Sequence, residues 1–387
     1  MKKVLFVHDG PMYTNADKSI FYGVHYNDIL VERYSYFGDK VSFMMRSTVV
    51  SELQAKKYSV IQHPAFSFIE VPNFKSLSSY FKKSIAEKII KKAVDEHDII
   101  VLRLPSAIGS IAFDYAKSIN KPILIEMVAC VFDALWNYDW RGKLIAKYKM
   151  HKNQTILQNA SHTIYVTDEF LQKRYPTKGK SIGCSDVIVN NLEVSILNKR
   201  LLKIENSPKI LVLGTVAAID VPYKGQSYVI KALSILKKQN VFYKYKIVGQ
   251  GDPARVMNII KECDVEDLVE VIGPLQQEKV FDFLDNIDLY IQPSKQEGLP
   301  RAVIEAMSRA CPILGSNIAG IPELLNKESL FEAGNIQEIV KLLKQLNKLT
   351  MEQWSRENFV KAETFKKAIL DVKREEFYKE FLQDICS

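Results

Sequence analysis

Short apolar runs alternate with longer amphipathic segments along most of the chain. The short runs are bounded by polar residues and suit buried parallel strands, whereas the segments between them have the length of helices. This β-then-α order predicts doubly wound parallel sheets covered by helices. In the first half the predicted strands are 4–7, 41–45, 98–102, 122–126 and 163–166, and the predicted helices are 20–37, 78–95, 107–119 and 142–159.

The alternation is interrupted once and then resumes. Residues 176–207 lack it and are rich in glycine, proline and asparagine, so we expect the connection between two domains there. The second series of predicted strands is 209–214, 245–249, 269–273, 288–291 and 312–315. We therefore expect an α/β fold with two Rossmann-like domains, residues 1–203 and 204–358, and a C-terminal helix over 359–387.

Composition narrows the class of protein. At 387 residues the chain is long enough for two cores, and 47% hydrophobic with 25% charged residues is typical of globular proteins. No apolar run approaches the ~20 residues of a membrane span, and the first one ends at His8, too early for a signal peptide. Five scattered cysteines without C-x-x-C spacing favour the reducing cytoplasm over a disulfide framework or zinc site.

Positive charge is concentrated in the first half. Residues 1–200 hold 28 Lys and Arg against 19 Asp and Glu, whereas the remainder holds 25 against 26. This asymmetry indicates an anionic partner for the first domain. Segments 81–92 and 141–152 mix lysines with bulky apolar residues, as helices on an anionic membrane surface do. A solvated helix is at least as good an interpretation of 81–92. Nucleic acid is not expected, because no recognisable binding module accompanies the charge.

The segment I-Q-P-S-K-Q-E-G-L-P-R-A-V-I-E-A-M at 291–307 is the most informative part of the chain. A predicted apolar strand ends at the start of this segment. Proline and glycine then break regular structure, and Pro300 has the φ suited to opening a helix. Glu297 therefore lies in a loop at the carboxyl end of a strand, and Glu305 about one turn into the next helix. Open parallel sheets bind ligands at that edge, so we predict that both carboxylates face a ligand.

The pattern E-x7-E within P-S-x-x-E-G-L-P-x-x-x-I-E-A-M resembles the donor-site signature of retaining glycosyltransferases with the GT-B fold, family 4 in particular. The resemblance implies two Rossmann-like domains facing a central cleft, with the C-terminal helix crossing back to the first. It implies that Glu297 lies beside the donor hexose and that Glu305 binds the nucleotide ribose. The alternative interpretation is that both glutamates are simply solvated. That interpretation does not explain why glycine, proline and serine occur at the family's positions.

Other donor-site positions follow from the same resemblance. Lys224 in Y-K-G-Q-S is similar to the family's K-G lysine, whose flexible ammonium pairs with the donor diphosphate. The family's arginine is replaced here by Thr215, and Arg301 is the candidate to restore its charge, with a surface role as the equal alternative. The backbone positions expected near the donor are Gly298, Leu299, Pro300 and Arg301 at the diphosphate, Gly273 at the nucleobase and Gly10 at the phosphates.

Two further features were weighed. The run G-Q-G-D-P-A at 249–254 matches a dinucleotide-binding pattern, but it lies outside the first βα unit and Asp252 would repel a pyrophosphate. In the first domain, Glu126 and Asp133 flank an aromatic and acidic stretch suited to a sugar. They are candidate catalytic residues, and a helix cap or a solvated carboxylate is the alternative for each.

We therefore expect a retaining glycosyltransferase that moves a hexose from a nucleotide-diphosphate sugar to a glycan or lipid-linked glycan acceptor. The histidines lack ligand spacing and no D-x-D occurs, so no metal and no cofactor beyond the sugar nucleotide is expected. A cytoplasmic protein, peripheral at the inner face of the membrane, is the expected location. The alternatives are a nucleotide-sugar epimerase of the same fold and a non-catalytic partner subunit that keeps the fold.

Overall fold

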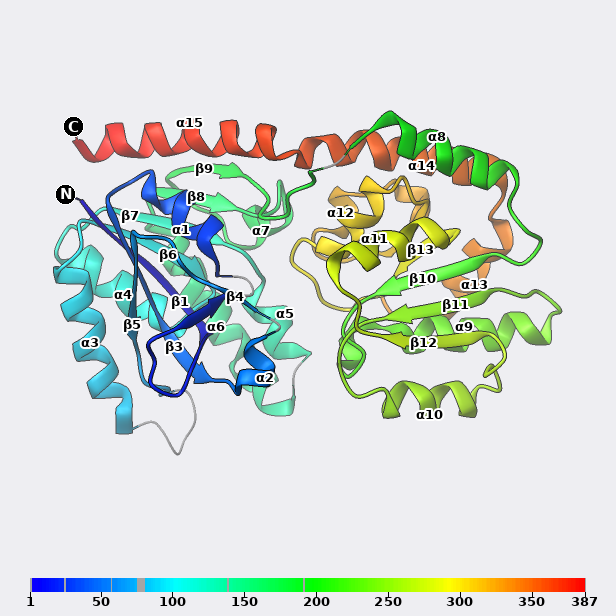
Figure 1. Ribbon diagram of the computed structural model, residues 1–387, viewed down its shortest axis with the longest axis horizontal. Coiled ribbons are helices and arrows are strands. Elements are labelled where there is room, and N and C mark those ends of the chain that lie inside the picture. The colour runs from blue at the N-terminus through cyan, green and yellow to red at the C-terminus, as the bar shows by residue number, and fades with distance from the viewer. Residues whose placement is uncertain are drawn as a thin grey trace.

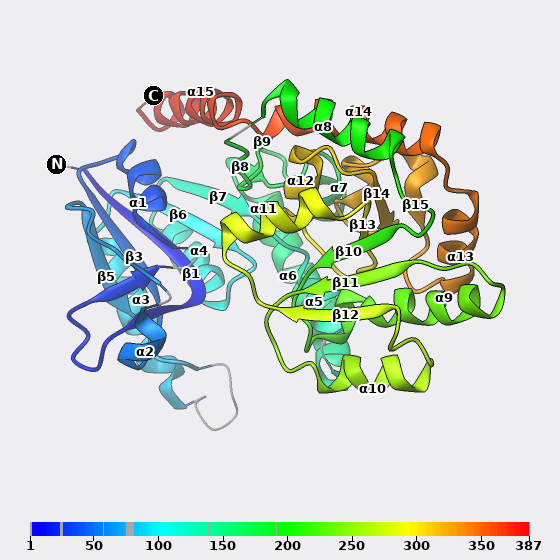
Figure 2. The same cartoon turned by 45° about the vertical axis from the view of Figure 1, so that its right-hand side comes forward.

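The computed structural model describes residues 2–23, 26–56, 58–74, 81–137, 139–190 and 192–386. Two α/β domains lie side by side, and the C-terminal helix α15 (Lys367–Cys386) runs back from the second domain along the first (Figures 1 and 2). This architecture confirms the predicted fold class.

The first domain is built on a mainly parallel sheet with the strand order β5-β3-β1-β6-β7-β8-β9. Two short strands extend it: β2 pairs antiparallel with the end of β1, and β4 pairs antiparallel with β2. The strands are β1 (Lys3–Thr14), β2 (Phe21–Gly23), β3 (Lys40–Val49), β4 (Ser59–Val60), β5 (Phe66–Glu70), β6 (Ile99–Leu104), β7 (Ile123–Met127), β8 (His162–Tyr165) and β9 (Lys180–Gly183). The helices are α1 (Asp28–Ser35), α2 (Glu52–Ala55), α3 (Lys83–Asp95), α4 (Ala107–Ser118), α5 (Val131–Trp136), α6 (Trp140–Gln158) and α7 (Phe170–Arg174).

The central strands β1, β6, β7 and β8 are largely buried, as continuous apolar runs predict for parallel strands. Along β1, Leu5 and Val7 pack into a cluster with α3, α4 and α6, whereas Val4 and Phe6 pack into a second cluster with α1 and α15. Helix α15 thus closes one face of the first domain, and its Phe381 and Tyr378 stand against Phe37.

Two sequence predictions in this domain were wrong in detail. The strand expected at 4–7 continues to Thr14, because an irregularity between Val7 and Pro11 lets the chain resume pairing with β3. The helix expected at 20–37 is strand β2 followed by the shorter α1, which Asn27 caps by accepting from the Leu30 N–H. Residues 24–25 of that helix and 78–80 of the helix expected at 78–95 lie outside the described residues.

The second domain carries a parallel sheet in the order β12-β11-β10-β13-β14-β15. Its strands are β10 (Val212–Val216), β11 (Lys244–Val248), β12 (Val269–Gly273), β13 (Leu289–Gln292), β14 (Ile313–Ser316) and β15 (Leu330–Phe331). Its α-helices are α8 (Val194–Glu205), α9 (Gln226–Lys238), α10 (Ala254–Glu262), α11 (Gln277–Asn286), α12 (Arg301–Ser308), α13 (Ile336–Gln345) and α14 (Lys348–Ala362), and its 3₁₀ turns are η2 (Pro222–Lys224), η3 (Ile321–Glu323), η4 (Lys327–Ser329) and η5 (Glu363–Phe365).

Helix α8 spans the boundary expected at residue 203, and all of it packs on the second domain. Its buried Arg200 donates to the carbonyls of Leu284 and Ile287 at 2.7 and 2.6 Å. It thus provides hydrogen-bond donors for carbonyl groups at the C-terminal end of α11. The chain therefore crosses between the domains ahead of Val194. There the Val189 N–H donates to the Phe365 carbonyl at 2.9 Å, so the outgoing and returning crossings run side by side.

Candidate active site

The loop after β13 carries the predicted donor signature and is fastened to the loop at η2. The Lys295 N–H donates to the Tyr223 carbonyl at 2.7 Å, and Gly225 approaches Pro293 closely. A Cβ at Gly225 would lie 1.8 Å from the Pro293 carbonyl oxygen, and its φ is +77°, so only glycine fits there. This contact explains the K-G pair: the glycine lets Lys224 approach residues 293–300, which we call the donor loop.

Glu297 lies at the centre of a polar cluster that includes Lys224. Its Oε1 accepts from Lys224 Nζ at 2.7 Å, from Ser294 Oγ at 2.7 Å and from Gln292 Nε2 at 2.9 Å. Among the described residues, every hydrogen bond of this carboxylate falls on Oε1, and none reaches Oε2. The predicted sugar-binding and phosphate-binding residues are therefore brought together.

Glu305 lies on α12 beneath the start of α11. Gln277 Nε2 donates to its Oε1 at 2.8 Å, and the residue is only 9% exposed. Burial raises the pKa of Glu305, while the Gln277 hydrogen bond and the positive charge of Arg301 oppose that rise. Arg301 is the first residue of α12, is exposed, and acts on Glu305 through its charge; its contact with the diphosphate stays a prediction.

Both glutamates lie near the buried Tyr290 of β13. Burial raises the pKa of Tyr290 well above its usual value, and the charges of Glu297 and Glu305 raise it further. The two carboxylates therefore share one neighbourhood at the carboxyl end of the sheet. The pairing of these residues in one place is what the E-x7-E interpretation requires.

The donor loop meets the first domain directly. A Cβ at Gly298 would lie 2.8 Å from the Val128 carbonyl oxygen after β7, and Leu299 packs against the cores of both domains. The Gly320 N–H donates to the Gly298 carbonyl at 3.0 Å, which ties the loop to η3. The carboxylate of Glu323 in η3 accepts from the N–H groups of Asp168 and Phe170 in the first domain, at 2.7 and 2.5 Å.

Other predicted donor positions are placed as follows. Thr215, at the position of the family's arginine, is buried in β10 and donates to the Ile291 carbonyl at 2.6 Å, so it serves the sheet. Gly273 ends β12 with a φ of +89° and open space beside it. Pro300 is the N-cap residue of α12. Gly10 was expected in a loop but lies within β1, against the Tyr26 ring and Met45, because the strand is longer than predicted.

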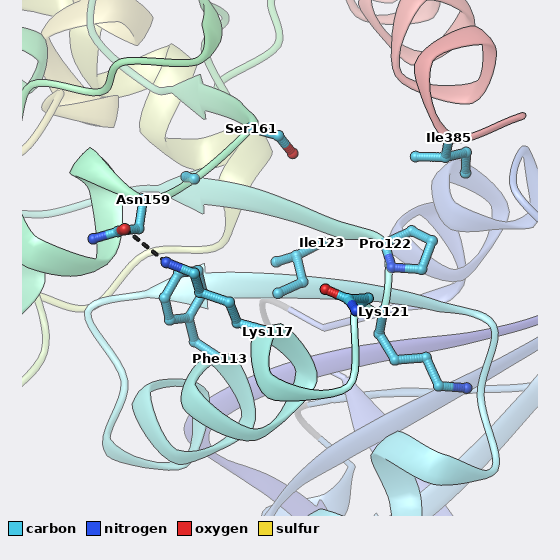
Figure 3. Close-up of a pocket in the computed structure, with 10 residues that line it drawn as sticks. Phe113, Lys117, Lys121, Pro122, Ile123, Asn159, Ser161 and Ile385 are labelled. Carbon is cyan, nitrogen blue, oxygen red and sulfur yellow. Dashed lines mark hydrogen bonds between the residues drawn. The ribbon is translucent and has the colours of Figure 1, made fainter. Parts of the chain in front are cut away.

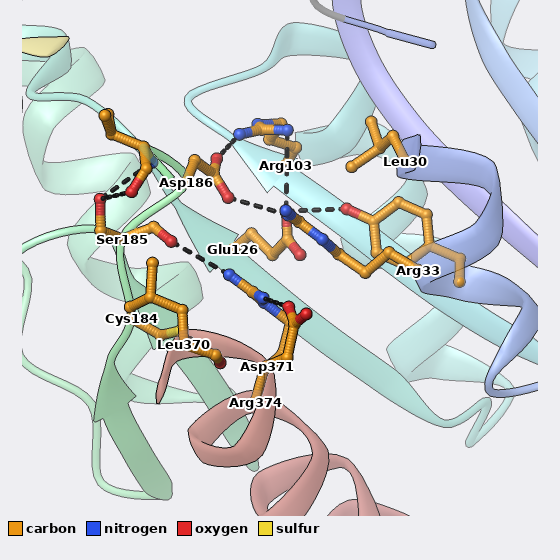
Figure 4. A network of polar contacts seen from close by, with 12 residues as sticks. Leu30, Arg33, Arg103, Glu126, Cys184, Ser185, Asp186, Leu370, Asp371 and Arg374 are labelled. Atoms are coloured by element: carbon orange, nitrogen blue, oxygen red, sulfur yellow. Dashed lines mark hydrogen bonds and ion pairs between the residues drawn. The ribbon is translucent and has the colours of Figure 1, made fainter. Parts of the chain in front are cut away.

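Glu126, which was predicted as a catalytic residue, lies in a buried polar network of the first domain (Figure 4). Its buried carboxylate accepts from the Tyr34 hydroxyl at 2.8 Å and lies 4.0 Å from Arg103, which also pairs with Asp186. Asp186 accepts in turn from Arg33 at 2.9 Å. Since this network lies between the sheet, α1 and α15, its role is to join those elements.

Asp133 is likewise held within the first domain. Its Oδ1 accepts from Arg174 Nη2 at 2.9 Å, and the Arg174 guanidinium lies over the Phe132 ring. This ion pair joins α5 to the end of α7. Its carboxylate thus has a structural partner, and a contact between Asp133 and the sugar stays a prediction.

A groove of about 330 Å³ lies elsewhere on the first domain (Figure 3). It is lined by Lys117, Asn159 and Ile385, among others, and Lys117 Nζ donates to Asn159 at 2.6 Å. All of its lining residues belong to the first domain or α15. The groove is therefore separate from the donor loop.

Sequence reasoning missed three residues that support the glutamates. Gln292 and Ser294 flank the strand end and bind Glu297, and Gln277 binds Glu305. Ser294 belongs to the quoted P-S signature, so a signal for it was present. Gln277 lies twenty-eight positions from Glu305, and only the fold brings the two together.

Comparison with protein-family models matches residues 196–364 to the glycosyl transferases group 1. Over 362 residues the chain is 31% identical to Protein CapJ of Staphylococcus aureus, covering 92% of this chain and 89% of that protein. The chain belongs to the group 1 glycosyltransferases. It is also 34% identical over 134 residues to the amylovoran biosynthesis glycosyltransferase AmsK of Erwinia amylovora, covering 32% of this chain and 33% of AmsK.

Solved structures show that the fold of this glycosyltransferase is shared more widely than its sequence. Sucrose-phosphate synthase from Thermosynechococcus elongatus aligns with a TM-score of 0.68 at 14% identity, covering 99% of this chain and 100% of that one. Anabaena Alr3699/HepE in complex with UDP and glucose aligns with a TM-score of 0.65 at 16% identity, over 99% and 100% of the two chains. Among the described helices of this glycosyltransferase, none has the length and apolar character to cross a membrane.

Proposed function

We propose that this enzyme is a retaining, metal-independent glycosyltransferase of the family 4 type, which transfers a hexose from a nucleotide-diphosphate sugar in polysaccharide biosynthesis. The observation that carries the proposal is the 2.7 Å pair of Glu297 and Lys224 in a loop that faces the first domain. The names of relatives support it, since they include glycosyltransferases of amylovoran and colanic acid biosynthesis. HepE, of similar fold, was solved with UDP-glucose.

The chemistry assigns separate tasks to the paired residues. Glu297 binds a hydroxyl of the hexose through its second oxygen, and the Lys224 ammonium neutralises the leaving diphosphate. The bond from the anomeric carbon to the phosphate oxygen breaks as the acceptor oxygen bonds to that carbon from the same face. The acceptor proton passes to the departing phosphate oxygen. Glu305 holds the ribose through a carboxylate that is ordered by Gln277.

A panel of sugar nucleotides tests this function. UDP-glucose, UDP-galactose, UDP-N-acetylglucosamine, GDP-mannose and dTDP-glucose would be compared by thermal shift, because a ligand stabilises in proportion to its affinity. The best donor is then incubated with acceptors in the presence of EDTA, and the anomer formed is identified by NMR. We expect transfer with retained configuration. Release of a free epimer without acceptor, or an inverted product, would overturn the proposal.

The acceptor side of the proposal is a lipid-linked glycan at an anionic membrane surface. Helix α6 exposes Trp140, Leu144 and Tyr148 at a spacing of four residues, with 67%, 73% and 65% of each residue accessible. Residues four apart lie on one face of a helix, and the flanking sequence is basic. Aromatic and leucine side chains bordered by lysines suit the boundary between headgroups and acyl chains.

Vesicle binding separates this surface from an ordinary exposed helix. The double variant Trp140→Ser, Leu144→Ser should lose co-sedimentation with phosphatidylglycerol vesicles, while binding to pure phosphatidylcholine is weak for both proteins. Leu349→Ser removes an equally exposed leucine from the second domain and serves as the matched control. Wild-type binding by the double variant would refute the membrane assignment and leave the donor site unaffected.

A further inference from the structure

Gln292 is the last residue of β13 and is almost wholly enclosed, with 2% of it exposed. Its amide nitrogen donates to both Glu297 Oε1 and Ser294 Oγ, at 2.9 Å each. Its amide oxygen accepts from the Tyr290 hydroxyl at 2.6 Å. All of these partners belong to the donor loop or to the strand beneath it, so the amide links the sheet to Glu297.

The Glu297 carboxylate and the Tyr290 hydroxyl together fix which way this amide points. A carboxylate only accepts, so Glu297 Oε1 requires the amide N–H, and the Tyr290 hydroxyl then donates to the amide oxygen at 2.6 Å, closer than the Val216 carbonyl at 3.4 Å. A reversed amide would place an oxygen against Glu297 Oε1 and leave Tyr290 facing an N–H. The side chain of Gln292 therefore has one favourable orientation, and its N–H groups are directed at the donor loop.

The consequence for Glu297 lies in how its two oxygens differ. Three donors converge on Oε1, from Gln292, Ser294 and Lys224, and none of the described residues bonds to Oε2. Lys224 is long and flexible and is the partner that a diphosphate would attract. Gln292 and Ser294 are short, buried and fixed by the sheet. They hold the carboxylate in place when the lysine shifts toward a phosphate.

We propose that Gln292, oriented by the Tyr290 hydroxyl, is a positioning residue that holds Glu297 so that its second oxygen is presented to the donor hexose. This inference rests on the proposed function and adds the origin of sugar affinity to it. Because the buried amide already holds Glu297 in one rotamer, little rotamer freedom is lost when the sugar binds. A carboxylate held within a fraction of an ångström binds a hydroxyl best.

The test compares Gln292→Leu and Tyr290→Phe with the wild-type enzyme. The affinity of the best sugar nucleotide from the panel is measured beside that of its parent nucleoside diphosphate, by calorimetry, together with kcat and the donor KM. Both variants should bind the diphosphate as the wild type does, lose the added affinity due to the sugar, and fall on the order of tenfold in kcat/KM. Tyr243→Phe removes another buried hydroxyl, bonded to the Leu343 carbonyl at 2.6 Å, and should leave transfer unchanged.

A double variant distinguishes positioning from general damage. Adding Glu297→Gln to Gln292→Leu should lower kcat/KM by less than it does in the wild type, because the two side chains act as one unit. Wild-type kcat/KM in Gln292→Leu, or an equal loss of diphosphate and sugar-nucleotide binding, would overturn this inference while leaving the proposed function intact. If Glu297→Gln itself transfers normally, or no sugar nucleotide in the panel binds, the proposed function fails and the inference with it.

Discussion

Glu297 and Glu126 each lie near basic side chains at the carboxyl ends of parallel strands, one in each domain. Their side chains are similarly enclosed, with 10% and 5% exposed, so burial does not distinguish them. Their surroundings distinguish the two glutamates. Glu126 lies between a sheet and two helices, where Arg103, Arg33 and Asp186 join several elements (Figure 4). Glu297 lies in a glycine-containing loop that meets the other domain.

The difference teaches how to recognise a ligand-binding carboxylate when burial is uninformative. A structural carboxylate has its partners on several packed elements, so that removing it loosens those elements. The ligand-binding candidate Glu297 lies in a loop at the edge of its domain, and its partners Gln292, Ser294 and Lys224 come from the strand end, that loop and the neighbouring η2. The comparison predicts that substitutions at the two glutamates have opposite consequences for activity and stability.

Glu297→Gln should show the largest effect. We expect kcat/KM for the best sugar nucleotide to fall by about 10²- to 10³-fold, as for the loss of a preorganised polar contact in an active site. The melting temperature should change little, because Gln292 and Ser294 remain to bind the new amide oxygen. Steady-state kinetics and calorimetric melting check this, and Glu278→Gln, an exposed neighbour, is the control. Normal activity would remove the distinction between the two glutamates.

Glu126→Ala should show the reverse pattern. Removing the carboxylate leaves the buried Tyr34 hydroxyl without its acceptor, while Asp186 still pairs with Arg103, so we expect a cost of about 1–3 kcal/mol in the free energy of unfolding. Urea unfolding monitored by circular dichroism measures this loss. The kcat of the folded fraction should stay within about twofold of wild type, since this carboxylate touches no part of the donor loop. A stable but inactive variant would restore Glu126 as a catalytic candidate.

Glu323→Gln addresses the contact between the domains. The carboxylate accepts two N–H groups of the first domain, and hydrogen bonds to a charged group contribute about 1.5–3 kcal/mol. A glutamine retains one acceptor oxygen, so we expect the donor KM to rise about tenfold and the radius of gyration from solution X-ray scattering to increase. Glu328→Gln, which changes an exposed glutamate of η4, should alter neither quantity.

Glu305→Gln should change stability modestly, and the change should depend on pH. Burial raises the pKa of Glu305 above 4.5, so the folded state holds this proton more tightly than the unfolded chain does. Ionisation of this buried carboxylate therefore lowers the free energy of unfolding as the pH rises above 4.5. The variant should melt higher than wild type at pH 7, by about 2–4 °C for each kcal/mol recovered. The gap should close as the pH falls toward 4.5, and a gap independent of pH would contradict the assignment.

The second domain was easier to predict than the first. Strands β11 to β14 lie within about a residue of their predicted positions, because buried parallel strands are continuous apolar runs flanked by turns. The cluster of Glu297 and Lys224 was predictable from spacing and resemblance. In the first domain, Glu126 and Asp133 were chosen for their residue type near a strand end. Arg103 is brought to Glu126 by the register of β6 and β7, and Arg174 is brought to Asp133 by the packing of α7 on α5. Neither contact can be read from spacing along the sequence.

The side-by-side chain crossings described above have a mechanical consequence. The backbone passes between the domains near Val189 and again near Phe365, and a hydrogen bond of 2.9 Å ties the two passages into one narrow hinge. A rotation of one domain about this connection would change how Gly298 meets Val128.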